Sequence, residues 1–288
     1  MARRLWGPIG AGLLLCATVL WPARASAQPT VLRLGLGPYQ PTLTATTKTY
    51  EPLAAYLATT LNIQVQLFPA DSWAGVSEAL RTGHVDAALA GPFGYVLAHR
   101  ASGAPAIAVL DYRGKPLYHA IMIANPATGI TNLAQAKGHS FAFADPGSTS
   151  GYLIPLAYFQ SHGINPKTYF SAVTFTGSHA ANELAVATGR IAVATDFDRN
   201  RNTMIEGGRI AANATRIIWT SPPLPNDAFA VSTTLASDHA FVARLRAALL
   251  AIHGSHILPR GYTGFENTTD ALYDPIRRAA HTVHVAGF

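Results

Sequence analysis

Three hydroxyl residues stand in a row in this chain, at Ser148, Thr149 and Ser150, directly after an Asp-Pro-Gly turn. A short apolar run at 141–144 precedes the turn, and a second apolar run with helical character, 153–159, follows the hydroxyls. Serine and threonine favour helix N-termini because their side-chain oxygens accept hydrogen bonds from free backbone N–H groups. One hydroxyl is enough to cap a helix. Three of them, beside those N–H groups and the positive end of the helix dipole, predict a site for a tetrahedral oxyanion.

His179 is the next residue with chemistry suited to such an anion. It follows a predicted strand, 173–175, and the sequence Thr-Gly-Ser, and it opens a predicted helix, 179–188. A lone histidine is more often a structural residue than a ligand-binding one. The Thr-Gly-Ser sequence directly before it and the serine-rich turn upstream favour a role in anion binding. Other histidine pairs have the spacing of metal ligands but no nearby carboxylate or cysteine, so we expect no metal site.

Polar residues follow most of the predicted strands, which is where open α/β sheets bind their ligands. Strands and helices alternate at short spacing up to residue 125, and the alternation restarts after Pro126. This pattern predicts βαβ units and mostly parallel sheets flanked by helices. The polar strand ends are 71–72, 91–93, 145–150, 176–179, 196–199 and 221–227.

Two α/β halves without a flexible linker predict two lobes packed around a cleft. The first lobe is expected to comprise residues 28–122 and 229–288, and the second lobe residues 123–228. Two crossing strands, near 118–124 and 227–232, should join the lobes and act as a hinge that closes on the ligand.

Composition excludes several classes of protein. The chain has 288 residues, of which 49% are hydrophobic and only 12% charged, so it can bury a sizeable core and is not disordered. The formal charge is +6, and three of these charges are arginines near the N-terminus, which leaves about +3. Without a dense Lys/Arg run the chain is not expected to bind nucleic acid, and a mild positive balance suits a small anion.

The N-terminus reads as a cleaved signal peptide, residues 1–27. Arg3 and Arg4 precede a mostly apolar run at 5–20, and Ala-Ser-Ala at 25–27 fits the small-residue cleavage pattern, with cleavage after Ala27. A membrane anchor is the alternative, but prolines at both ends keep the run short for a membrane span. We therefore expect a periplasmic protein.

Cys16 is the only cysteine and lies within this segment. It is a candidate for lipidation, although the residue before it, Leu15, is bulky where lipoprotein signals carry a small one. Cleavage after Ala27 would leave a mature chain without cysteine or disulfide, which an exported bacterial protein tolerates.

Five segments of the chain, taken in order, resemble one known family. They are YEPLAAYL, EALRTGHVDAALAGP, FAFADPGSTSGYLIP, FTGSHAANELAVATGR and IIWTSPPLPND. This order of motifs is similar to that of the periplasmic phosphate-, phosphite- and phosphonate-binding proteins of ABC transporters, and the likeness extends from about residue 31 to 241. It implies a two-lobed, hinge-closing binding protein of the type II periplasmic kind. It also implies no catalysis, no cofactor, and a membrane permease as partner of a monomeric protein.

The resemblance also assigns the ligand-binding residues. It implies that the anion is held by the serine-rich turn, the histidine after the next strand, an aromatic residue on the strand that crosses between the lobes, an aromatic residue at the edge of the first lobe, and an acidic residue after the proline-rich turn. In this chain these are Ser148, Thr149, Ser150, His179, Tyr118, Trp73 and Asp227. A dianionic phosphoryl group needs several charge-assisted donors at about 2.7–2.9 Å, which hydroxyls, amides and a histidine provide. A carboxylate such as Asp227 only accepts hydrogen bonds, so it favours a protonated oxyanion or an amine over sulfate.

Three positions depart from the family pattern. Trp73 stands where many members carry a tyrosine, so its hydrogen-bonding role differs. Ala192 replaces the common acidic residue of a second-lobe strand. Arg199 stands at the position where members that bind aminoalkylphosphonates carry a glutamate for the amine. The arginine predicts a ligand without a cationic tail, such as phosphite, phosphate or an alkylphosphonate.

Two other functions fit parts of the sequence. A hydrolase would use Ser148 or Ser150 with His179 and Asp145, yet no Gly-x-Ser-x-Gly elbow is present, and three hydroxyls indicate hydrogen bonding rather than one activated nucleophile. A ligand-sensing protein that contacts a membrane receptor would use the same fold and would need a separate output partner.

Overall fold

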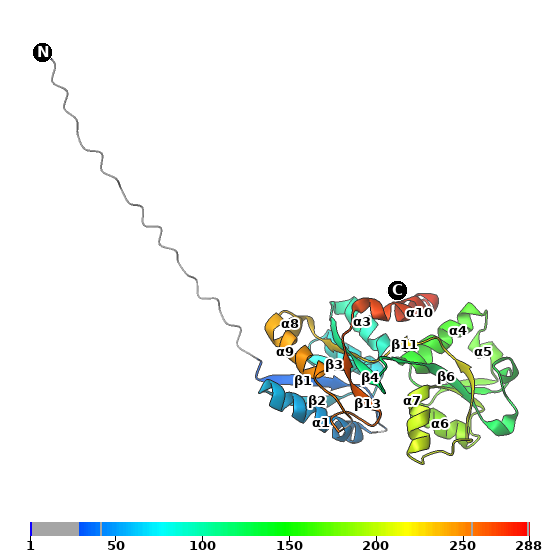
Figure 1. Ribbon diagram of the computed structural model, residues 1–288. Coiled ribbons are helices and arrows are strands. Elements are labelled where there is room, and N and C mark those ends of the chain that lie inside the picture. The colour runs from blue at the N-terminus through cyan, green and yellow to red at the C-terminus, as the bar shows by residue number, and fades with distance from the viewer. Residues whose placement is uncertain (2–28, 41, 255, 287) are drawn as a thin grey trace.

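Two β-sheets, one in each half of the molecule, form the framework of the chain (Figure 1). The computed structural model describes Met1 and residues 29–40, 42–254, 256–286 and 288. Apart from Met1, the predicted signal peptide with Cys16 lies outside the described residues.

The first sheet has six strands in the order β13-β4-β12-β3-β1-β2. β1 pairs in parallel with β2 and β3, whereas β12 and β13 run antiparallel to their neighbours. The strands are β1 (Val31–Leu36), β2 (Gln64–Pro69), β3 (Ala87–Ala90), β4 (Ala106–Tyr112), β12 (Ala228–Val231) and β13 (Tyr262–Glu266). The helices of this lobe are α1 (Leu43–Leu61), α2 (Trp73–Arg81), α3 (Pro92–Ser102), α8 (Thr233–Ala236), α9 (His239–Leu250) and α10 (Asp274–Thr282), with a short 3₁₀ turn η4 (Asp270–Tyr273).

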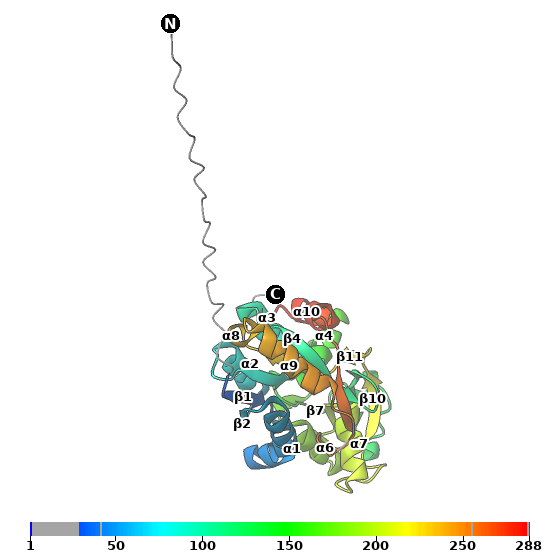
Figure 2. The ribbon, with the colours of Figure 1, turned by 60° about the vertical axis from the view of Figure 1, so that its left-hand side comes forward.

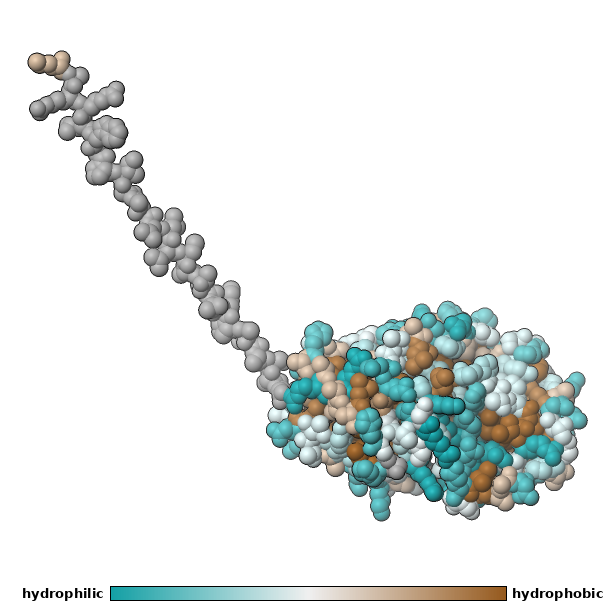
Figure 3. Space-filling model, in the orientation of Figure 1, coloured by the Kyte–Doolittle hydropathy of each residue, from teal (hydrophilic) through white to brown (hydrophobic). Residues whose placement is uncertain are grey.

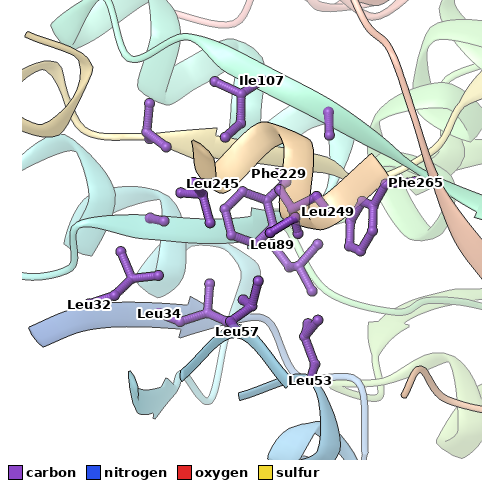
Figure 4. Packing of buried hydrophobic residues seen from close by; sticks show 14 of the residues in the cluster. Leu32, Leu34, Leu53, Leu57, Leu89, Ile107, Phe229, Leu245, Leu249 and Phe265 are labelled. Atoms are coloured by element: carbon purple, nitrogen blue, oxygen red, sulfur yellow. The ribbon is translucent and has the colours of Figure 1, made fainter. Parts of the chain in front are cut away.

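Large apolar side chains from strands and helices meet in the core of this lobe (Figure 4). Leu32 and Leu34 alternate with more exposed residues on β1, as expected for a strand with one buried face. Leu53 and Leu57 lie one helical turn apart on α1 and pack on the same cluster as Phe229 of β12. Each such buried side chain contributes about 1.5–3 kcal/mol, so the first lobe is a rigid support for the residues at its strand ends.

The second sheet has five strands in the order β10-β6-β9-β7-β8. β7 pairs in parallel with β8 and β9, and β6 runs antiparallel to β9 and β10. The strands are β6 (Ala120–Ala124), β7 (Ser140–Phe143), β8 (Ala172–Phe175), β9 (Val193–Phe197) and β10 (Arg216–Thr220). The helices are α4 (Ile154–Ser161), α5 (Pro166–Tyr169), α6 (His179–Ala187) and α7 (Asp198–Glu206), with 3₁₀ turns η1 (Pro126–Thr128) and η2 (Ala134–Ala136).

Two short segments carry the chain between the sheets. They are β5 (Leu117–Tyr118) and β11 (Leu224–Pro225), which pair with each other in an antiparallel ribbon. The expected crossing strands were placed a few residues too late, because 120–124 is β6 of the second sheet and 228–231 is β12 of the first. The predicted lobe boundaries, after 122 and after 228, therefore cut through strands. The apolar run through His119 carries no turn residue that would have marked the break.

The predicted fold class is confirmed, with both sheets more mixed than the alternation of strands and helices indicated. β13 and α7 are among the elements that were missed. β13 has the sequence YTGFE, and its central glycine weakens the strand signal. The strand is formed through its antiparallel pairing with β4. α7 has the sequence DRNRNTMIE, which lacks an apolar period and buries only Arg199 and Met204.

The last helix, α10, packs against both lobes. α10 packs on α3 of the first lobe and on α4 of the second, which both ribbon views show (Figures 1 and 2). Its buried residues Ile276 and Ala280 belong to the same apolar cluster as Leu153 of the second lobe. Among the described residues no helix has the length and apolar character of a membrane span.

Candidate functional site

A cavity of about 290 Å³ lies between the two lobes. Residues of the first lobe that line it include Tyr39, Trp73 and Tyr262, and residues of the second include the serine-rich turn and the N-termini of α6 and α7. Figure 3 shows hydrophilic residues gathered over α7, beside the junction of the lobes. All eight sequence-predicted ligand residues line this one cavity: Trp73, Tyr118, Ser148, Thr149, Ser150, His179, Arg199 and Asp227.

The serine-rich turn has an unusual backbone. Residues Thr149–Leu153 form a single π-helical turn, η3, between β7 and α4. Such turns are frequent at functional sites. Gly151 is required here, because a Cβ atom at this position would lie 2.6 Å from Ala144 Cβ and 2.9 Å from His179 Cε1. The close approach brings the turn directly against α6, and the three hydroxyl residues are almost completely buried at the base of the cavity.

Each hydroxyl of the turn has a different neighbour. Ser148 Oγ accepts a hydrogen bond from the Gly151 N–H at 3.0 Å and lies 3.0 Å from His179 Nε2. Thr149 Oγ1 accepts from the Phe93 N–H of the first lobe at 2.8 Å. The Tyr118 hydroxyl approaches Ser150, and burial raises the pKa of that tyrosine, so it is a neutral donor. Hydroxyl groups from both sides of the cleft therefore converge on one place.

His179 begins α6 and stands between the turn and a buried acid. Its Nδ1 atom lies 3.1 Å from Oδ1 of Asp196 on β9, without forming a hydrogen bond to any described residue. Burial lowers the pKa of His179 to about 4, although the carboxylates of Asp145, Asp227 and Glu183 oppose that shift. Without a ligand the imidazole is therefore neutral near neutral pH.

Asp227 faces the cavity from the loop between β11 and β12. The Tyr39 hydroxyl donates to its Oδ2 atom at 2.6 Å. Burial raises the pKa of Asp227 to about 6, while the bond from Tyr39 and the charge of Arg199 lower it. At neutral pH the carboxylate is mostly ionised and can accept a hydrogen bond from a hydroxyl group.

Arg199 is enclosed at the hinge side of the cavity. Its guanidinium donates to Asn226 Oδ1 and to the Leu117 carbonyl oxygen, both on the connecting segments. The rings of Tyr112, Tyr118 and Tyr262 surround it, with ring centroids 4.6, 5.3 and 5.9 Å from Cζ. Because protein groups already accept hydrogen bonds from the guanidinium and enclose it, Arg199 is a fixed positive charge at this end of the cavity.

Trp73 forms part of the first-lobe wall. It stands at the N-terminus of α2 after the capping residue Ser72, and its ring packs edge-on against Tyr39 with centroids 5.1 Å apart. The close contact requires glycine opposite, because a Cβ at Gly37 would lie 2.3 Å from the indole. The indole ring thus forms part of the cavity wall.

Sequence reasoning missed several residues of the site, among them Tyr39, Asn226 and Tyr262, and misassigned one contact. Tyr39 and Asn226 follow strand ends, which was the available signal, and Tyr262 lies on the missed strand β13. Asp145 accepts from the Gly147 N–H at 2.8 Å, and the carboxylate at His179 Nδ1 is Asp196 instead. The Ser-His-Asp arrangement expected for a hydrolase with Asp145 is therefore not formed by that residue.

Comparison with known proteins agrees with this geometry. The profile of the family described as ABC transporter, phosphonate, periplasmic substrate-binding protein matches residues 39–273. The chain belongs to this family. A solved binding-protein component of an ABC phosphonate transporter from Pseudomonas aeruginosa is 26% identical, with a TM-score of 0.78 over 90% of this chain and 87% of the other. The predicted family and the two-lobed type II periplasmic fold are both confirmed.

Two relatives of this phosphonate-binding family match part of the chain. The phosphate-import protein PhnD of Mycolicibacterium smegmatis is 32% identical over 200 residues, which are 66% of this chain and 62% of the relative. The phosphonates-binding periplasmic protein of Escherichia coli is 29% identical over 217 residues, which are 73% of this chain and 63% of the relative. The chain thus matches a little over three fifths of the length of these curated relatives.

Proposed function

We propose that the protein is the substrate-binding component of an ABC importer and that it binds a small phosphorus oxyanion in the cleft. The observation that carries this is the convergence of the Ser148–Ser150 turn, His179 and Tyr118 from both lobes on one cavity. These are donors without a full cation, which suits a doubly charged phosphoryl group enclosed by neutral hydrogen-bond donors. The names of the relatives, one for phosphate and one for phosphonates, support the same ligand class.

The residues of the cavity have separate proposed roles. Ser148, Thr149, Ser150, Tyr118 and His179 bind the oxyanion. Asp227 accepts a hydrogen bond from the P–O–H group of a singly protonated oxyanion, which disfavours sulfate because sulfate has no proton to donate. Trp73 forms the apolar wall, the β5–β11 ribbon is the hinge, and a membrane permease receives the ligand from a monomeric, periplasmic protein whose signal peptide is cleaved after Ala27.

Arg199 sets the proposed limit on the ligand's tail. A guanidinium does not deprotonate in proteins, and at 4 Å a second cation would be repelled by roughly 4 kcal/mol at an effective dielectric constant of 20. The aromatic cage around Arg199 keeps that charge in the cavity. Phosphate, phosphite and methylphosphonate should therefore bind more tightly than 2-aminoethylphosphonate.

The test is a thermal-shift panel of phosphate, phosphite, methylphosphonate, 2-aminoethylphosphonate and sulfate, followed by titration calorimetry. Ligand at a thousand times its dissociation constant adds about 4 kcal/mol to stability, which is readily detected. Titrations of the methyl and aminoethyl compounds on Arg199→Gln and Arg199→Glu complete the test, and both variants should shift preference toward the amine. Stabilisation by none of the phosphorus compounds would refute the proposed function.

A hydrolase is the second candidate. Ser148 Oγ lies 3.0 Å from His179 Nε2, and His179 Nδ1 lies 3.1 Å from Asp196 Oδ1. Two observations favour binding over catalysis. Ser148 Oγ is occupied as the acceptor for the Gly151 N–H, and His179 Nδ1 makes no hydrogen bond to a described residue that would orient the ring as a base. We therefore expect no release of phosphate from p-nitrophenyl phosphate and no consumption of the phosphonates during the titrations.

A further inference from the structure

The cavity extends beyond the groups that are proposed to bind the oxyanion. On α7 its lining continues from Arg199 and Asn200 to Thr203 and Met204, which lie one turn further along the same face of the helix. At a rise of about 1.5 Å per residue, this part of the wall is about 7 Å long. The cavity therefore follows α7 from its N-terminus into the second half of the helix.

The volume of the cavity leaves room for a ligand larger than phosphate. It is about 290 Å³, which corresponds to about ten water molecules at roughly 30 Å³ each. Methylphosphonate has about half that number of non-hydrogen atoms, so it fills only part of this space. A ligand with a longer tail can therefore reach the groups along α7 while its phosphoryl group stays at the serine-rich turn.

Two arginines, one from each lobe, line this part of the cavity. Arg209 follows α7 in the second lobe, Arg260 precedes β13 in the first, and both are exposed. Within the described part of the chain, neither guanidinium makes an ion pair or a hydrogen bond to another residue. Arg199, in contrast, donates to Asn226 and to the Leu117 carbonyl oxygen. The N–H groups of the two exposed arginines are therefore the ones that are free to bind a ligand.

Contacts between the lobes bring the two arginines to the same end of the cavity. Glu206, the last residue of α7, pairs with Arg113 of the first lobe at 2.7 Å. The Arg113 N–H donates to the carbonyl oxygen of Gly261, the residue after Arg260, at 3.0 Å. Arg209 comes three residues after Glu206. The C-terminal end of α7 and the segment before β13 therefore lie side by side (Figure 1).

The acids of the cavity lie elsewhere. Among the described residues that line it, the carboxylates are those of Asp145, which precedes the serine-rich turn, and Asp227, which accepts a hydrogen bond from Tyr39. Neither α7 nor the segment before β13 contributes an acid to the lining, and Glu206 of α7 is already paired with Arg113. This end of the cavity is therefore positively charged without a carboxylate of its own.

We propose that Arg209 and Arg260 form a second anion subsite, and that the ligand is a phosphonate whose tail ends in a carboxylate. This inference rests on the proposed function. The phosphonate group binds at the serine-rich turn, and the tail follows α7 to the two guanidinium groups. A guanidinium presents its N–H donors as a planar fork that fits the two oxygens of a carboxylate. Arg199 lies on the same wall and disfavours an amine along this path.

The position of the two arginines on opposite lobes links the tail to the joining of the lobes. Two guanidinium groups repel each other when no anion lies between them, and a carboxylate between them replaces that repulsion by attraction to both. An amide of the same shape also accepts hydrogen bonds, but it has no charge. The comparison of a carboxylate with its amide therefore isolates the electrostatic contribution of this subsite.

The test is titration calorimetry of the purified protein with 3-phosphonopropionate and with the carboxamide of the same compound. We expect the carboxylate to bind at least about fivefold more tightly than the amide in dilute buffer, because two charge-assisted contacts are made only by the carboxylate. This ratio of affinities should shrink at about 1 M salt, where exposed charges are screened within about 3 Å.

Variants of the two arginines locate the effect. Arg209→Gln and Arg260→Gln should each lower the ratio, and the double variant should bring it close to one. The ratio is the readout because loss of a positive charge weakens binding of the phosphonate group in both ligands alike. Arg190→Gln is the matched control, since Arg190 is an exposed arginine of the second lobe that is not part of the cavity lining. It should keep the wild-type ratio.

Methylphosphonate, titrated alongside, separates this inference from the proposed function. A wild type that binds methylphosphonate but does not prefer the carboxylate over the amide would refute the subsite and leave the proposed function intact. A double variant that keeps the wild-type ratio would refute the assignment to these arginines in the same way. A wild type that binds no phosphorus oxyanion would refute both.

Discussion

Ser150 differs from the other two hydroxyl residues of the turn in the contacts that its side chain makes. Ser148 caps the turn and contacts His179, and Thr149 accepts a hydrogen bond from the opposite lobe, so substitution of either changes more than ligand binding. Ser150 lies beside the Tyr118 hydroxyl at the point where the two lobes meet. It is therefore the residue at which the contribution of a single ligand contact can be measured most directly.

Ser150→Ala should weaken binding of the phosphorus oxyanion at least about tenfold, because a hydrogen bond to a charged group contributes about 1.5–3 kcal/mol. The melting temperature without ligand should hardly change. Titration calorimetry gives the affinity. The matched control is Ser171→Ala, because Ser171 is an exposed serine directly before β8. Equal affinities of the wild type and Ser150→Ala would place the anion elsewhere in the cavity. Thr149→Ala should lose affinity as well, with an added loss of contact between the lobes.

Glu183 predicts a pH dependence of stability. Its pKa is raised from 4.5 to about 9, so the folded protein holds this proton more tightly than the unfolded chain. That contribution is fully present below about pH 4.5 and is lost as the pH rises toward 9. Glu183→Gln cannot ionise, so its melting temperature should match the wild type near pH 4 and exceed it by several degrees near pH 9, since 1 kcal/mol corresponds to about 2–4 °C. A constant difference across this pH range would contradict the assignment.

Elements with strong local signals were predicted well, and those formed by tertiary pairing were not. The strand predicted at 173–175 is β8, Ala172–Phe175, and the helix predicted at 179–188 is α6, His179–Ala187, because both have local sequence patterns that need no partner to be recognised. α7 was missed because its face toward the protein is made by Arg199 and Met204, and an arginine is not counted as an apolar residue. The same arginine is surrounded by aromatic rings of the first lobe and of the connecting segment β5, which no local pattern encodes.

The serine-rich turn is the element whose backbone was least predictable. A helix cap was expected there, and a π-helical turn is present, because the chain must pass between Ala144 and His179 with only a glycine at position 151. The residues of the turn were read from the sequence, whereas their close packing against α6 depends on contacts across 28 or more positions. The two buried acids near His179, Asp196 and Glu183, were not predicted as part of the site for the same reason.

Gly151→Ala should disrupt the turn. The added Cβ would lie 2.6 Å from Ala144 Cβ and 2.8 Å from Ser148 Oγ, so the backbone must shift. Overpacking of this kind costs about 1–3 kcal/mol. We expect a lower melting temperature and loss of measurable oxyanion binding. Ser161→Ala, at the exposed end of the following helix α4, is the control and should leave both unchanged; normal binding by Gly151→Ala would show that the turn adapts.

At the scale of the whole molecule, the cleft is formed by contacts between lobes as well as by the hinge. Thr149 bonds to Phe93, the turn at Gly147 lies against the start of α2, and α10 packs on both lobes. The two-lobed arrangement was predictable because the α/β pattern restarts. The exact crossing points were not, because β5 and β6 follow one another in a single apolar run. Closure of the lobes on a ligand stays a prediction.

Gly147 offers a test of closure that leaves the anion-binding groups in place. A Cβ at this second-lobe residue would lie 2.8 Å from the backbone nitrogen of Ala74 and 3.1 Å from Trp73 Cβ, both in the first lobe. Since backbone atoms of α2 cannot move aside easily, Gly147→Ala should hold the lobes apart. The separate lobes should fold normally, and affinity should fall at least about tenfold because the donors of the two sides no longer meet on one anion.

The measurement is small-angle X-ray scattering with and without saturating methylphosphonate, together with calorimetry. The wild type should become more compact on binding, and Gly147→Ala should keep the dimensions of its free form. Gly75→Ala is the matched control, because its Cβ would meet only first-lobe atoms, the nearest being Ser72 Oγ at 3.1 Å. If Gly147→Ala closes and binds like the wild type, the contact between this turn and α2 is not part of the ligand-bound state.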